Sequence, residues 1–136
     1  MDPRYSEAYV EQIIHERDGD RLHQLLSVLA RRATLPDDLW AFNRMLEWLG
    51  SIRSGVWQYY GGIDQSDFGR LQDWLLRVDL PELHARYTAG MVEFSAGGDG
   101  SQLDRWIDEH DSEILAALWQ RVTPHCDWLK VTAGAG

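Results

Sequence analysis

Histidine and cysteine are the residues of this chain with the most versatile chemistry, because imidazole and thiolate act as nucleophiles, general bases and metal ligands. The chain has one cysteine, Cys126, and five histidines, His15, His23, His84, His110 and His125. No two histidines have the spacing that holds zinc on one helix face, so we expect no metal site. The run His125-Cys126-Asp127 has the residue types of a thiol enzyme, but adjacent helical residues do not face one another. We therefore interpret Cys126 as a small apolar residue near the end of the last helix.

The chain also lacks the common short motifs of enzymes. It contains no phosphate-binding loop, no dinucleotide-binding fingerprint and no Gly-x-Ser-x-Gly nucleophile elbow. We expect no enzyme activity and no cofactor. A small enzyme with an unrecognised site is the competing hypothesis, and a pocket holding a group with a perturbed pKa would support it.

The densest charge in the chain is acidic and lies in residues 99–113. Its six acids, set against Arg105 alone, are Asp99, Asp104, Asp108, Glu109, Asp111 and Glu113. Asp104, Asp108 and Asp111 are four and then three residues apart, which places them in one stripe on a helix. Each like-charge pair at this spacing costs about 0.2–0.5 kcal/mol, and a basic partner would relieve the repulsion. The alternative interpretation is an ordinary solvated face.

An aromatic cluster with flanking glycines occupies residues 54–62, Ser-Gly-Val-Trp-Gln-Tyr-Tyr-Gly-Gly. Trp57 and Tyr60 are three residues apart, so one turn of helix would pack both rings into a core, with Gln58 bonded to neighbouring backbone. The alternative is a recognition surface, on which Trp57, Tyr60 and the more distant Trp106 would anchor a partner.

This cluster resembles a motif of the small acidic bacterial DNA-mimic proteins, Asn-Gly-Gly-Phe-x-Gln-Tyr-Phe. The matching residues are Gly55, Trp57, Gln58, Tyr59 and Tyr60, whereas Ser54 and Val56 differ from the motif. The resemblance continues through residues 81–94 and 103–122 and covers about two thirds of the chain. It implies an all-helical protein without enzyme activity, whose carboxylates imitate DNA phosphates and occupy the DNA site of a basic protein.

The overall charge agrees with such a partner. The 136 residues hold 13 Lys and Arg against 22 Asp and Glu, a net charge of -9, which disfavours direct binding to nucleic acid. Residues 61–136 carry most of this charge, with thirteen acids against six bases. No apolar run approaches the roughly 20 residues that span a bilayer, and the first residues do not resemble a signal peptide. We therefore expect a cytoplasmic protein that binds no membrane.

The elements that must position these residues are helices, because apolar residues recur at intervals of three and four. We expect an all-α fold, one compact domain of about six helices over residues 1–131, followed by a flexible tail over 132–136. The expected helices cover residues 6–18, 21–32, 35–50, 65–78, 81–94 and 101–122. Asp20, Asp64 or Ser66, and Ser101 with Asp104 are the expected caps, and Gly19 is the expected stop of the first helix. A break near His110 stays open, because Asp111 could cap a new helix.

Together these patterns predict an acidic interaction protein that blocks a basic, nucleic-acid-binding protein. The expected contact residues are Asp104, Asp108, Glu109, Asp111, Glu113, Trp106, Trp57 and Tyr60. The alternative is an immunity protein, or another inhibitor, of a bacterial toxin or nuclease. The sequence leaves open whether the chain is a monomer or a homodimer, since no heptad pattern specifies a dimer.

Overall fold

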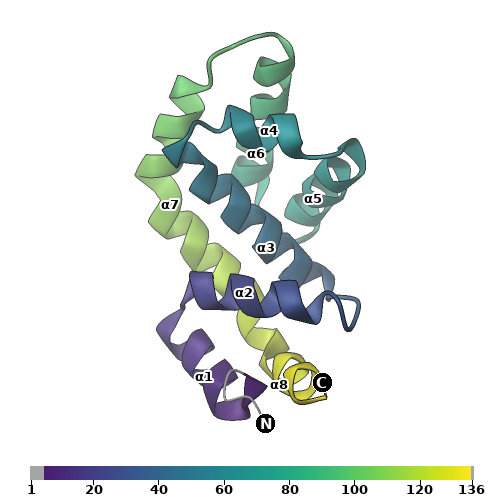
Figure 1. Ribbon diagram of the computed structural model, residues 1–136. Coiled ribbons are helices and arrows are strands. Elements are labelled where there is room, and N and C mark those ends of the chain that lie inside the picture. Colours follow the sequence, from purple (N-terminus) through teal and green to yellow (C-terminus); the bar gives the residue numbers. More distant parts are fainter. Residues whose placement is uncertain (1–4, 136) are drawn as a thin grey trace. The chain divides into compact units, whose positions relative to one another are not determined.

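The computed structural model describes residues 5–135, and the regular elements within them are all helices (Figure 1). The α-helices are α1 (Glu7–Glu16), α2 (Gly19–Leu29), α3 (Asp37–Gly50), α4 (Trp57–Gly62), α5 (Gln65–Arg77), α6 (Pro81–Ser95), α7 (Ser101–Val122) and α8 (Cys126–Gly134), with 3-10 turns η2 (Ser51–Arg53) and η3 (Thr123–His125). The predicted all-α class is confirmed. The six expected helices are present. Two short helices were not expected, α4 between α3 and α5, and α8 after α7. No helix in the described part of the chain is long and apolar enough to cross a membrane.

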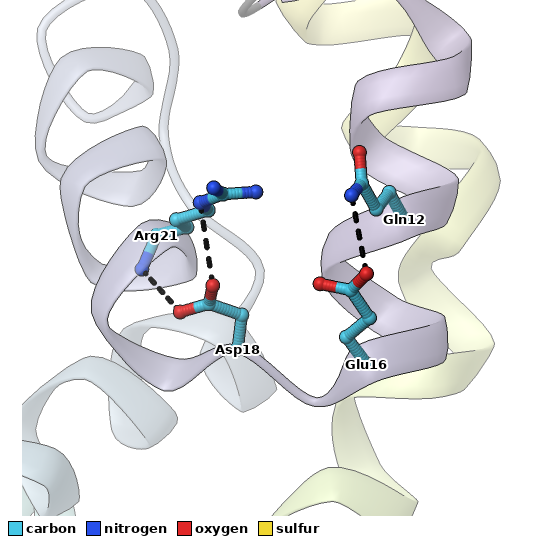
Figure 2. Close-up of polar contacts among 4 residues, drawn as sticks. All are labelled: Gln12, Glu16, Asp18 and Arg21. Carbon is cyan, nitrogen blue, oxygen red and sulfur yellow. Dashed lines mark hydrogen bonds and ion pairs between the residues drawn. The ribbon is translucent and has the colours of Figure 1, made fainter.

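The junction between α1 and α2 differs from the expectation by two residues. Arg17, not Gly19, takes the left-handed conformation that ends α1, with φ 51°. Asp18, not Asp20, caps α2, because its Oδ1 accepts a hydrogen bond from the Arg21 amide at 3.1 Å (Figure 2). The cap therefore lies one residue before the glycine, and Gly19 becomes the first residue of the helix.

The contacts within the chain divide it into two compact units. The first consists of residues 5–46 and 116–135, and the second is Glu47–Leu115. Helices α3 and α7 each begin in one unit and end in the other. The sequence contains no sign of this division, because it falls inside two helices whose apolar periodicity continues across it. Residues 1–4 of the predicted domain lie outside the described residues.

The first unit is built from α1, α2, the start of α3, the end of α7, and α8. Phe42 and Trp119 meet edge to face in its core, with ring centroids 4.9 Å apart. Helix α8 packs on α1 and is also tied to it at the surface, where Lys130 donates to Glu11 at 2.5 Å. Helix α8 extends to Gly134, so residues 132–134 are helical although we expected a flexible tail there. Ala133, in this segment, is buried. Residue 136 lies outside the described part.

Helix α7 is continuous from Ser101 to Val122, so the chain does not break near His110. Its start is capped differently from the expected Ser101–Asp104 box. The Asp99 carboxylate accepts from the backbone N–H of Ser101 at 3.0 Å and from its hydroxyl at 2.9 Å. These hydrogen bonds lower the pKa of Asp99 below its ordinary value, and the bond from the Ser101 backbone has the larger effect. The carboxylate of Asp104 is therefore available to accept a hydrogen bond from another segment.

Candidate functional site

The acids of α7 lie on two flanks of the helix rather than on one face. Within the second unit, the buried side of α7 carries Leu103, Ile107 and Ile114. At about 100° per residue, Asp111 and Glu113 are about 200° apart around the helix axis. The aspartate stripe and the glutamates therefore border the buried side from opposite directions, which the spacing of the three aspartates alone did not reveal.

Asp104 is a structural acceptor for α4. It is half-buried, and its Oδ1 accepts from the backbone N–H of Val56 at 2.9 Å. Val56 is the N-cap residue of α4, a six-residue helix that has no side-chain cap of its own. The carboxylate of Asp104 thus satisfies an N–H group at the entrance to that helix. Asp104 belongs to the internal architecture of the unit, as well as to the predicted stripe.

The remaining acids differ in how far they reach solvent. Asp111 is half-buried, whereas Asp108, Glu109 and Glu113 are exposed. We call these last three residues the acidic surface of α7; they span its exposed side, from Asp108 on the aspartate flank to Glu109 and Glu113 on the other. Their carboxylates can meet a partner without disturbing the packing described above. Of the five acids expected to contact a partner, these three are the most accessible.

Tyr60 cannot contact a partner, because its side chain is only 2% exposed. Its hydroxyl accepts from Trp48 Nε1 at 3.0 Å and donates to the Tyr87 carbonyl oxygen at 2.7 Å. Burial raises the pKa of this phenol above its ordinary value. Gly90 leaves the space it needs, since a Cβ there would lie 2.7 Å from Leu103 Cδ2 and still closer to the Tyr60 hydroxyl. Tyr60 is a core residue, as the helix-turn interpretation of this cluster expected.

Trp57 holds the loop between α6 and α7. It is half-buried, and its Nε1 donates to the carbonyl oxygen of Gly98. Its ring meets Tyr60 and Phe94 edge to face at 5.9 and 5.7 Å. Gly100 lies against the indole with φ 74°, a conformation and a proximity that exclude larger residues. The indole of Trp57 is thus committed to contacts within the unit.

Gln58 does not bond to neighbouring backbone as expected. Its side chain is exposed and makes no hydrogen bond to any residue among 5–135. The residues of the motif are therefore explained by packing at Trp57 and Tyr60, and the glutamine between them faces solvent.

Trp106 is the predicted contact residue with the most informative surroundings. It is half-buried, and the His110 ring stacks on its indole with centroids 4.5 Å apart and planes 18° apart. The guanidinium of Arg86, from α6, lies 4.9 Å from the indole centroid. The pair Trp106 and His110 could have been found from their spacing of four residues. Arg86 could not, because only the packing of α6 on α7 brings it there.

In the His125-Cys126-Asp127 run, the histidine pairs with a residue from outside the run. His125 Nε2 lies 2.7 Å from Oδ2 of Asp38, which belongs to the first turn of α3. This pair joins α3 to the turn before α8 within the first unit. Among the residues that the structure describes, no group of three or more His, Cys, Asp or Glu side chains could hold a metal ion.

Comparison with known proteins gave no match to a family model, to a curated protein or to a solved structure. The charge and geometry of residues 5–135 are therefore the observations from which a function is inferred.

Proposed function

We propose that this chain is a cytoplasmic bacterial interaction protein without enzyme activity, which binds a basic protein and blocks its nucleic-acid site. The observation that carries the proposal is the uneven distribution of charge. Residues 47–115, the second compact unit, hold 13 Asp and Glu against five Arg, whereas the rest of the chain holds nine acids and eight bases. One unit therefore supplies nearly all of the negative field that would steer a cationic partner.

The acidic surface of α7 is the part of this unit that we propose for contact. Proteins that bind nucleic acid grip phosphates through Lys and Arg side chains. Carboxylates offer those side chains the same sign of charge and similar acceptor oxygens. Glu109 and Glu113 are four residues apart, about 6 Å along the helix axis, so one extended basic segment could reach both. Support for mimicry of DNA comes from this chemistry together with the resemblance of residues 54–62 to the DNA-mimic motif.

An inhibitor of a basic toxin or nuclease would use the same surface, and the identity of the partner distinguishes the two roles. The first step is capture of partners from a lysate of the source bacterium, with elution by a salt gradient. A basic transcription factor released at moderate salt supports DNA mimicry, and a toxin or nuclease supports an immunity role. If no basic protein is retained at low salt, the acidic surface is only a solvated face and the proposal fails.

The contact surface is tested with the triple variant Asp108→Asn, Glu109→Gln, Glu113→Gln. Neutralising these exposed acids should slow association with the captured partner and flatten its dependence on salt, because steering acts mainly on the association rate. The rates are measured by surface plasmon resonance at several salt concentrations.

A matched control removes three exposed acids from the first unit, Glu16→Gln, Asp20→Asn and Asp127→Asn. It changes the net charge equally but leaves the acidic surface of α7 intact. Equal effects of the two triple variants would contradict the proposed surface, since only the net charge would then matter.

A further inference from the structure

In the free protein, the indole of Trp106 already lies against a cationic side chain. The Arg86 guanidinium lies over its indole at 4.9 Å, well within the roughly 6 Å over which a cation is attracted to an aromatic face. Arg86 is an exposed residue of α6. Although its unit is rich in acids, Arg86 forms no ion pair with any residue in the described part of the chain. Among residues 5–135, the Trp106 indole is thus the only group with which the Arg86 side chain makes a polar or ring contact.

The indole is also held in place. The His110 ring stacks on it at 4.5 Å, and His110 Nδ1 lies 2.7 Å from the backbone oxygen of Trp106, to which it donates. A ring that is fixed before binding loses little side-chain entropy when a partner arrives. Trp106 therefore has the preorganisation that aromatic anchors of protein interfaces need.

Carboxylates border this position on the exposed side of α7. Glu109 follows Trp106 by three residues, and Glu113 follows His110 by three, so these four residues share one flank of the helix. Both glutamates are exposed. An aromatic face that accepts a cation is thus combined with two acids that could pair with the same incoming group.

We infer that Trp106 is the receptor for an arginine side chain of the partner, and that Arg86 occupies this place in the free protein. The inference rests on the proposed function and specifies its partner as arginine-rich rather than lysine-rich. A planar guanidinium stacks on an indole and binds carboxylates through two parallel hydrogen bonds, whereas the compact ammonium of lysine does neither. An exposed cation–π contact is weak, so a partner arginine that also pairs with Glu109 or Glu113 would displace Arg86.

The test measures binding of the full chain to two fluorescent peptides of equal length and charge, one of alternating Arg and Gly and one of alternating Lys and Gly. We expect the arginine peptide to bind more tightly, and the preference to disappear in Trp106→Leu. Thermal melts followed by circular dichroism establish that this variant is folded.

The decisive variant is Arg86→Gln, compared with Arg105→Gln. Arg105 is an exposed arginine of α7 in the same unit and makes no ring contact with residues 5–135. Both variants therefore change the charge equally. Vacating the indole should raise affinity for the arginine peptide by about 2- to 5-fold beyond the effect of Arg105→Gln, the factor that corresponds to a surface cation–π contact. This variant needs no change in a packed residue.

The outcomes separate the inference from the proposed function. If both peptides bind equally, or if the two arginine variants behave alike, Trp106 is not an arginine receptor, although binding of basic partners stands. If neither peptide binds at low salt, both the inference and the proposed function are wrong.

Discussion

The hydroxyl of Tyr60 bonds in two directions inside the second unit, to the indole N–H of Trp48 and to the carbonyl oxygen of Tyr87. The hydroxyls of Tyr59 and Tyr87 form a further buried hydrogen bond at 2.6 Å, which uses the Tyr87 side chain rather than its carbonyl. Buried polar groups of this kind contribute little when satisfied and cost much when one partner is removed. The aromatic motif therefore depends on its hydroxyl groups as well as on its ring packing.

Replacing Tyr60 with phenylalanine should destabilise the protein by about 1–3 kcal/mol, because the Trp48 N–H and the Tyr87 carbonyl lose their partner in a buried site. The free energy of unfolding is measured by urea denaturation. Tyr9→Phe is the control, since the Tyr9 hydroxyl makes no hydrogen bond to the described residues, and its effect should stay within about 0.5 kcal/mol. Equal effects of the two substitutions would contradict a stabilising role for the hydrogen bonds of the Tyr60 hydroxyl.

The same variant carries a pH signature. Burial raises the pKa of Tyr60 above its ordinary value of 10.0, so above pH 10 the unfolded chain releases a proton that the folded protein keeps. The contribution of the neutral phenol to stability is present in full below pH 10 and is lost as the pH rises above it. Tyr60→Phe should therefore lose stability less steeply than the native protein between about pH 9 and pH 11.

At the scale of the helix, Asp104 shows that an acid in a charged stripe can have a structural task. Its bond to the Val56 amide joins α7 to the start of α4, two segments 48 residues apart. We expect Asp104→Ala to cost about 1–2 kcal/mol, as loss of a helix cap does, and to accelerate hydrogen exchange at the Val56 amide.

Two variants test the cause of that effect. Asp104→Asn keeps an acceptor oxygen and should retain most of the stability, whereas Asp108→Ala removes an exposed charge and should change it by less than about 0.5 kcal/mol. If Asp104→Asn is as destabilising as Asp104→Ala, the charge of Asp104 and not its hydrogen bond is what matters.

At the scale of the whole molecule, salt should act in opposite directions on stability and on binding. With a net charge of -9, concentrated in residues 47–115, the folded chain repels itself, and screening relieves that repulsion. Raising the salt concentration from about 20 mM to about 300 mM, which shortens the Debye length severalfold, should raise the melting temperature. The same salt should weaken association with a basic partner.

The triple variant of the acidic surface provides the comparison. Because three like charges are removed, its melting temperature should depend less on salt than that of the native chain. A melting temperature that does not change with salt in the native protein would show that its acids do not repel one another appreciably.

Interactions between residues close in sequence determine much of the fold, so this part could be predicted from the sequence alone. Apolar residues at intervals of three and four specify helices, Asp64 caps α5 by accepting from the Asp67 amide, and Pro81 begins α6. These features depend on residues a few positions apart. The small residues of α8 carry a weaker pattern, so the burial of Ala133 appears only when α8 packs in the first unit.

The tertiary structure decided which candidate side chains remain accessible. Sequence spacing placed Asp104 in a stripe and Tyr60 among the contact residues, but long-range packing directs Asp104 to Val56 and buries Tyr60. It also brings Arg86 of α6 onto Trp106 of α7. Charge and periodicity are properties of the chain itself, whereas accessibility and the partner of each polar group depend on residues distant in sequence, which meet only in the folded protein.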